Sequence, residues 1–361
     1  MRHTPALKNN ILAYGIVIFG YIAIMAAIGA QSLNATIQGQ LAPICAYVVM
    51  AISLNLTVGI MGDLSLGHAG FMSVGAFSGA ISCMGFEGII RDDLTRLILA
   101  ILIGAICAGF AGVLIGIPVL RLRGDYLAIV TLAFGEIIKN IITCLYVGVD
   151  QRGMHFGFLT SIQAMNMEDG ARVIVEGPMG IRGIPRLSSF TIGFVLVLIT
   201  LFIVQNLVNS RSGRAIMALR DNRIAAESIG IPVTKYKLMA FVTSAALAGA
   251  AGTLYVMNFS TIVASKFNFS TSILILVFVV LGGLRNLWGS VIAAALLTIL
   301  PEMLRQFNDY RMLVYAIVLI LVMLATNNSA VREVFVKARS TLLSAIRMKP
   351  GAGGEGGQAN G

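Results

Sequence analysis

A succession of long, nearly uncharged apolar segments constrains this chain more than any other feature of its sequence. A helix needs about 20 apolar residues to cross the hydrocarbon core of a bilayer, so windows of roughly 18–24 such residues are candidate membrane spans. The candidates lie at 11–30, 41–60, 64–85, 97–120, 126–149, 190–208, 238–257, 271–284, 286–304 and 312–326. They predict an all-α, polytopic membrane helical bundle with about ten (eight to ten) transmembrane segments.

The composition supports a membrane protein and argues against a nucleic-acid-binding one. The chain is 57% hydrophobic and only 12% charged, whereas a soluble domain is about a quarter charged. Its net charge of +10 comes from Lys and Arg in the loops and tail, without the aromatic interleaving of a nucleic-acid surface. The four cysteines stand apart in apolar stretches with no CxxC, which is typical of small buried hydrophobic residues.

The distribution of Lys and Arg predicts the orientation of the spans, because these residues accumulate in cytoplasmic loops. With the N-terminus (1–10) inside, sixteen of the 26 Lys and Arg residues fall on the cytoplasmic side and nine outside, and Lys139 lies within a span. The apolar part of 11–30 is too long for a signal-peptide core, so we interpret it as a retained first span. An even number of spans then places both termini in the cytoplasm.

This topology divides the chain into a cytoplasmic N-terminus (1–10), a transmembrane domain (11–326) and a cytoplasmic tail (327–361) whose Gly-rich end is flexible. Two connections are long. Residues 150–189 form an extracytoplasmic loop that suits a cap over the outer mouth. Residues 209–237 form a cytoplasmic loop that contains an unusual charged segment.

That segment, ALRDNRIAAESIGI (218–231), is Ala-rich and predicts a helix where a connecting turn would be rich in Gly, Pro, Asn or Ser. On one continuous helix, Arg220, Arg223 and Glu227 share a narrow stripe, and small residues occupy the other side, which permits close approach by a partner. Gly230 and Pro232 would end the helix. The alternative is an interfacial helix whose charges only hold the topology.

Four stretches in this order resemble the LivM-type permease family of branched-chain amino-acid ABC transporters. They are GIMGDLSLGHAGFMSVGAF (59–77), RLRGDYLAIVTLAFGEIIKNI (121–141), SGRAIMALRDNRIAAESIGI (212–231) and LGGLRNLWGSVIAAALL (281–297). The resemblance covers most of residues 40–325. The chain departs from the family at two places. Position 285 is Arg, where the family often has a small residue, and residues 326–331 are TNNSAV, where the family often has an Arg-Pro-x-Gly-Leu turn.

The resemblance implies a permease subunit in the cell (plasma or inner) membrane that does no chemistry of its own. It implies as partners a second homologous permease, two cytoplasmic ABC ATPase subunits and an extracytoplasmic amino-acid-binding protein. The chain has no GxxxxGK[ST] to hold nucleotide phosphates, so ATP is expected to be hydrolysed by the partner subunits, and no cofactor is expected here. The predicted ATPase-coupling residues are Arg220, Asp221, Arg223, Ala225, Ala226, Glu227 and Gly230.

Polar residues inside the predicted spans are candidates for the translocation pathway, because charges at mid-membrane are costly and are usually paired or functional. Glu136 and Lys139 stand three apart on one helical face with Asn140 beside them. Either the pair locks its span in the bundle, or it meets the charged groups of a zwitterionic substrate. With Ser65 and His68 of the third span, the candidate pathway is Ser65, His68, Glu136 and Asn140.

The third span, 64–85, carries further Gly residues, of which Gly75 and Gly79 form a GxxxG typical of close helix packing. The alternative is a broken segment that exposes backbone groups to substrate. His68 has no second His or Cys at ligand spacing, so no metal site is predicted.

Three other functions remain possible from the sequence. Related permeases import urea, amides or other amino acids. A secondary transporter driven by a proton or sodium gradient would need its own ion ligands, and buried acids are few. An intramembrane hydrolase using Ser65 and His68 would need a third group and an oxyanion site, which the sequence does not indicate.

Overall fold

The computed structural model describes residues 17, 20–22, 24–26, 28–30, 35–122, 124–150, 153–158, 172–304, 310, 313–317 and 319–320. Much of the predicted spans 11–30 and 312–326, the N-terminus 1–10 and all of the tail 327–361 lie outside these residues. The departure noted at 326–331 therefore lies outside them as well.

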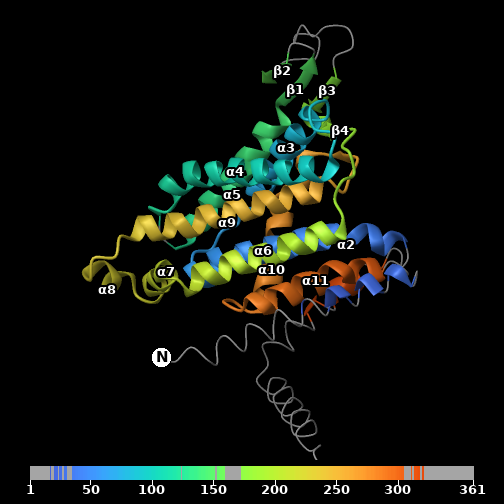
Figure 1. Cartoon of the computed structure of the whole chain (residues 1–361). Helices are drawn as coiled ribbons and strands as arrows, with labels where there is room; N and C mark the ends of the chain where they lie inside the picture. Colours follow the sequence, from blue (N-terminus) through green and yellow to red (C-terminus); the bar gives the residue numbers. More distant parts are fainter. Residues whose placement is uncertain are drawn as a thin grey trace, which may run out of the picture. The chain divides into compact units, whose positions relative to one another are not determined.

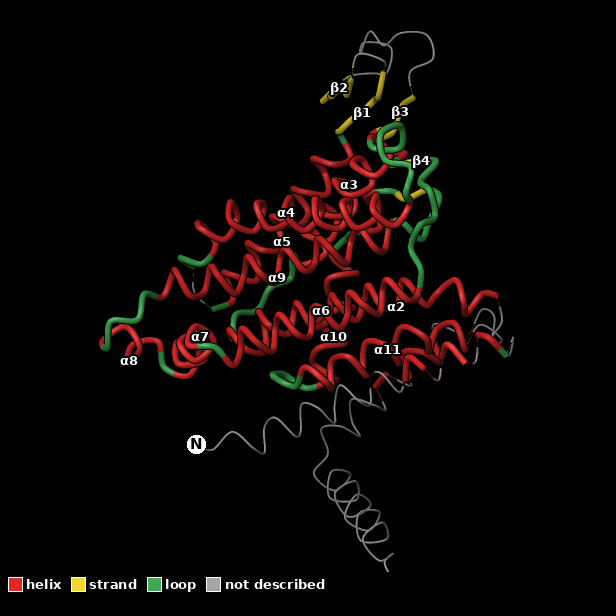
Figure 2. Tube along the Cα trace, viewed as in Figure 1, coloured by secondary structure: helices red, strands yellow, loops and turns green. Residues whose placement is uncertain are grey.

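The described chain is mostly helical (Figures 1 and 2). Helix α2 (Ala35–Asn55) continues into the π-helical turn η1 (Leu56–Met61). The other helices are α3 (His68–Gly85), α4 (Asp93–Val119), α5 (Asp125–Thr143), α6 (Phe190–Asn209), α7 (Arg211–Asp221), α8 (Arg223–Ser228), α9 (Val233–Val256), α10 (Phe269–Gly282) and α11 (Leu287–Met303).

Six segments of the described chain are long and apolar enough to cross a membrane, which confirms a polytopic helical membrane protein. They are Thr36–Met61, Asp93–Val119, Tyr126–Thr143, Phe190–Asn209, Val233–Val256 and Ala264–Gly282, and α11 is a shorter apolar helix. In the third predicted span, 64–85, the helix begins only at His68, and residues 62–67 before it are not helical.

Helix α9 lies at the centre of the helical packing, against α2, α3 and α4. Small residues allow this: a Cβ added to Gly75 of α3 would overlap the backbone of Gly249 in α9, and one added to Gly79 would overlap Thr253. The Thr253 hydroxyl also donates to the Gly75 carbonyl at 2.8 Å. The GxxxG prediction of close packing is therefore confirmed.

The prediction of an all-α fold is wrong in one region, where five short strands form an antiparallel sheet in the order β2-β1-β3-β4-β5 (Figure 2). The strands are β1 (Leu145–Asp150), β2 (Gly153–Phe158), β3 (Arg172–Glu176), β4 (Ile181–Arg182) and β5 (Thr261–Ile262). Helix α5 ends at Thr143, so the predicted span 126–149 was too long. Its last residues, LYVGV (145–149), are apolar enough for a span but belong to a half-buried strand, and hydropathy alone does not separate the two.

The sheet joins segments that are far apart in the sequence. Ile181 of β4 pairs with Ile262 of β5, which follows α9. Gly180, at φ +73°, makes this possible, because any Cβ there would overlap the Ile262 carbonyl. The sheet and the α7–α8 segment lie at opposite ends of α6 and α9 (Figure 1).

The turn between α10 and α11 is strained at Arg285, which has φ +73°, a conformation that usually requires Gly. The Asn55 side chain holds this turn: its Oδ1 accepts from the Arg285 amide at 3.1 Å, and its Nδ2 donates to Ser290 Oγ at 2.7 Å. The departure at Arg285 thus occupies a backbone position where glycine would be relaxed.

Candidate functional site

The charged segment at 218–231 is not one continuous helix, as the sequence predicted, but two short helices that meet at Asn222. The Asn222 backbone is extended (φ −152°, ψ 101°), and its Oδ1 accepts from the Ala225 amide at 3.0 Å. Asparagine favours such an N-cap over a helix interior, because its side chain competes for backbone amides. The predicted end is confirmed, since Gly230 follows α8 in the left-handed conformation (φ +83°).

The break at Asn222 sends the basic side chains of the two helices to different partners. Arg220 of α7 donates from Nη1 to the Gly59 carbonyl in η1 at 3.0 Å, and from Nη2 to Asp221 at 2.9 Å. Arg223 of α8 pairs with Glu227 at 2.8 Å. The predicted stripe of Arg220, Arg223 and Glu227 therefore does not exist, and Arg220 connects the segment to the membrane helices instead.

Two apolar side chains are exposed at α8: Ile224, which sequence reasoning missed, and Ile229, which directly follows the helix. Ile224 is 78% exposed and Ile229 is 77% exposed, whereas Ala226, a predicted contact residue, is buried at 3%. Ala225, Glu227 and Gly230 are exposed. The available signal was the presence of Ile224 and Ile229 within the charged segment 218–231, because exposed large apolar residues mark interaction surfaces when they cluster.

A second link joins α9 to the non-helical segment after η1. Lys237 Nζ lies 2.6 Å from Asp63 Oδ2, and both side chains are largely buried (12% and 17% exposed). Within the same region Thr57 donates to Ser244 of α9 at 2.9 Å. Residues 56–63, at the end of α2, are thus held both by α7 and by α9.

The polar residues predicted to line the pathway are not brought together. His68 is buried and bonds through Nε2 to Ser53 Oγ at 2.8 Å, while Ser65 is buried with no hydrogen-bond partner in the described chain. Because His68 pairs with Ser53 rather than Ser65, the geometry gives the hydrolase hypothesis no nucleophile–base contact.

Glu136 and Lys139 form the expected ion pair, and both are partly buried. Glu136 also lines a small cavity of about 10 Å³ with Asn268 and Ser272, whereas Asn140 is exposed. Among the described residues, no cluster of His, Cys, Asp or Glu is arranged to hold a metal ion.

Residues 36–323 match the family described as branched-chain amino acid transport system, permease component. The chain belongs to this permease family. Its multi-pass helical structure agrees with a location in the cell (plasma or inner) membrane.

Individual relatives include the high-affinity branched-chain amino acid transport system permease protein LivM of Salmonella typhimurium, which is 36% identical over 289 residues, and LivM of Escherichia coli, 35% identical over 293 residues. Each match covers 77% of this chain and 66% of the relative, so the chain spans slightly less than two thirds of these relatives. The fructose import permease protein FruG of Bifidobacterium longum is 24% identical over 271 residues, covering 72% of each chain. No solved structure matches.

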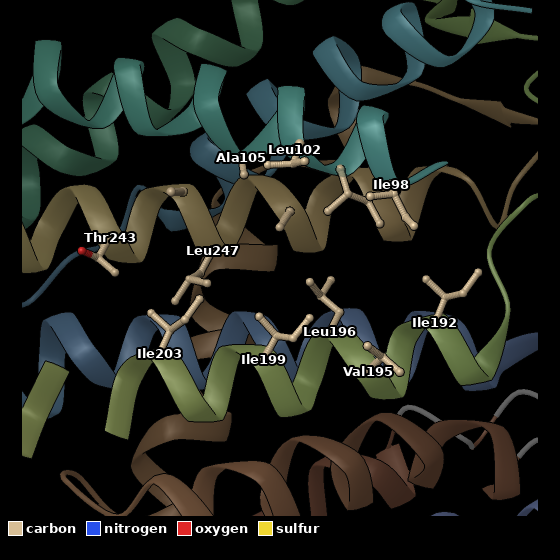
Figure 3. A pocket seen from close by; sticks show the side chains of 13 residues that line it. Ile98, Leu102, Ala105, Ile192, Val195, Leu196, Ile199, Ile203, Thr243 and Leu247 are labelled. Atoms are coloured by element: carbon tan, nitrogen blue, oxygen red, sulfur yellow. The ribbon is translucent and has the colours of Figure 1, made fainter. Parts of the chain in front are cut away.

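An apolar cleft of about 530 Å³ lies between α4, α6 and α9 of this permease (Figure 3). Ile98 and Leu102 line it from α4, Ile199 from α6, and Leu247 from α9. Its only polar side chain, Thr243, already donates to the Met239 carbonyl at 2.7 Å. A zwitterionic solute would lose its hydration without compensation there, so this cleft is not a site for an amino acid.

Proposed function

We propose that this chain is the membrane-spanning permease subunit of an ATP-driven ABC importer and forms part of the translocation pathway for leucine, isoleucine and valine. It acts with a second homologous permease, two cytoplasmic ATPase subunits and an extracytoplasmic amino-acid-binding protein. The chain itself hydrolyses nothing and binds no cofactor. The family membership and the names of the LivM relatives support this assignment.

One structural observation carries the coupling part of the proposal. Helix α8 presents Ile224 and Ile229 to the surface, and the preceding helix α7 is tied through Arg220 to the Gly59 carbonyl of a membrane helix. An ATPase subunit that binds the exposed apolar face of α8 would therefore move η1 and the end of α2. Such rigid-element motion would switch the path between inward-open and outward-open states.

The proposed topology follows from the charge bias of the loops and has ten spans with both termini in the cytoplasm. It places α7 and α8 on the ATPase side and the five-stranded sheet on the side of the binding protein. The ordered sheet supports a docking role for the outer loop, because it gives a fixed surface rather than a flexible connection. Cysteines introduced at Ser228 and Met179, labelled from one side of sealed vesicles, test this sidedness.

The decisive experiment reconstitutes the complete importer in liposomes and measures uptake of radiolabelled leucine. Uptake should require ATP, both ATPase subunits and the binding protein, and the permease alone should transport nothing. Uptake by the permease alone in an ion gradient would establish the secondary-transporter alternative instead.

One relative of this chain, FruG, is named for the import of another solute. A related importer for urea, amides or other amino acids is therefore the second candidate. Binding measurements on the co-purified binding protein distinguish the candidates, because that protein selects the solute. Tight binding of urea or an amide, and none of leucine, would reject the branched-chain assignment.

A further inference from the structure

A second hollow, of about 470 Å³, lies beside the start of α10 and differs chemically from the apolar cleft. Its apolar surface comes from Tyr47 of α2, Val263 and Leu274. Its polar lining residues include Lys266, Ser265 and Ser270. Small-molecule sites of 300–1,000 Å³ commonly combine such an apolar wall with a few convergent polar groups.

The backbone that carries these polar groups is held in place. Thr271 Oγ1 donates to the Lys266 carbonyl at 2.8 Å, and Asn268 Oδ1 accepts from the Thr271 amide at 3.1 Å. Just before this loop, β5 pairs with β4 in the sheet. The position of Lys266 is therefore preorganised by hydrogen bonds on both sides, as a binding site requires.

The two kinds of lining residue lie at different places along the candidate spans. Lys266 is near the start of the span Ala264–Gly282, shortly after strand β5, whereas Tyr47 lies about midway along the span Thr36–Met61. A lysine near the end of a span can keep its charge in water while its stem packs against apolar groups. The hollow therefore has its cation toward the sheet and part of its apolar wall deeper along α2.

The charge of the hollow favours an anionic group. No acidic residue lines it, and within the described chain no carboxylate forms an ion pair with Lys266. The ammonium is exposed and available. An ammonium beside hydroxyl donors, next to an apolar wall, matches a carboxylate attached to a small apolar side chain.

We propose that this hollow is a transient binding site for the transported amino acid, with Lys266 contacting its carboxylate and Tyr47, Val263 and Leu274 contacting its apolar side chain. The inference rests on the proposed function and names a substrate site within it. It does not use Ser65 and His68, whose side chains are buried. Lys266 and Leu274 become specificity-determining residues.

The test uses the complete importer in liposomes with saturating leucine-loaded binding protein, and measures leucine uptake and ATP hydrolysis together. K266Q should lower the uptake rate about tenfold, because it removes a charge-assisted contact. Assembly and ATP hydrolysis should stay within about twofold of wild type. K266R should keep most of the uptake, because it retains the cation. R91Q, at another exposed cation outside the hollow, is the matched control and should transport normally.

A second pair of variants keeps the test decisive if K266Q fails to assemble. L274W fills the hollow and should block uptake, whereas I273W, on the same helix but outside the hollow, should not. Normal uptake by K266Q or L274W would overturn the proposal, as would equal losses in K266Q and K266R, or in L274W and I273W. Absence of leucine uptake by the wild-type importer would instead reject the proposed function, independently of the variants.

Discussion

The Arg220 guanidinium donates a hydrogen bond of 3.0 Å to the carbonyl of Gly59, a residue 161 positions earlier in the chain. Arg220 belongs to α7, next to the exposed helix α8, and Gly59 belongs to the π-helical turn at the end of α2. The Arg220 side chain also covers Gly62, where a Cβ would overlap it. Single π-helical turns often occur at functional positions, and here one connects the α7–α8 segment to the apolar helix α2.

Breaking this link should uncouple the importer. R220A removes a hydrogen bond from a charged donor, worth about 1.5–3 kcal/mol, so leucine uptake per ATP hydrolysed should fall about tenfold. The ATPase subunits should still bind, because Ile224 and Ile229 are unchanged. R214A is the control, since Arg214 of α7 contacts only the nearby Asn209 carbonyl among the described hydrogen bonds. The same leucine uptake per ATP hydrolysed in R220A and wild type would contradict a coupling role for the Arg220–Gly59 hydrogen bond.

The Asp63–Lys237 ion pair should stabilise the folded permease, and the effects of changing Asp63 and Lys237 on its stability should not be additive. D63N leaves the Lys237 ammonium largely buried without its carboxylate, which should cost about 2 kcal/mol or more in the free energy of unfolding. The exchanged pair D63K/K237D should recover part of this loss. Thermal unfolding of the detergent-solubilised protein in a double-mutant cycle measures the coupling. Additive effects of the two single changes would rule the interaction out as a stabilising one.

The exposed face of α8 should be needed for assembly rather than for folding. I224E replaces an isoleucine side chain that is 78% exposed with a charged one. Because the original side chain is mostly exposed, the isolated permease should unfold at the wild-type temperature. Co-purification of the ATPase subunits should be lost, because contact residues near the centre of an interface contribute most of the binding energy. I89E, equally exposed at 78% but outside the segment, should leave ATPase binding intact. Retained binding in I224E would move the coupling surface elsewhere.

The close contact between α3 and α9 should tolerate no side chain at Gly75. G75V forces two backbones apart and should destabilise the protein by about 3 kcal/mol or prevent folding. G39A is the control, because nothing lies within 4 Å of a Cβ at Gly39 of α2, and it should be neutral or stabilising by up to about 1 kcal/mol. Yield of monodisperse protein and its unfolding temperature check both.

Acidification should destabilise the N-terminal end of α4. The Thr95 hydroxyl and then the Thr95 amide donate to Asp92, and these bonds hold the pKa of its carboxyl below its ordinary value of 3.8. Because the folded-state pKa is the lower one, the stabilisation is present above about pH 4 and is lost as the pH falls through the folded-state pKa. Unfolding curves should show a larger acid loss for wild type than for D92N, whose amide still caps the helix. Identical acid dependence would contradict the cap's role.

Some of the site was predictable from residue types alone, and the rest was not. Gly230 ends the charged segment as predicted, and Glu136 pairs with Lys139 as their spacing suggested. Asn222 was read as a helix-interior residue although asparagine is a common cap, because the Ala-rich context outweighed it. The partners of Arg220 and His68 could not be foreseen, since both lie on other helices.

The sequence by itself determined the class of this protein: apolar segments of membrane length leave helices as the stable form of a spanning backbone, and motif order indicated the permease family. Tertiary structure alone decided that residues 145–150 form a strand, that Arg220 reaches Gly59, and that Lys266 borders a hollow with Tyr47. The reason is physical. Hydropathy and local spacing act along the chain, whereas hydrogen-bond partners and hollows depend on which distant segments pack together.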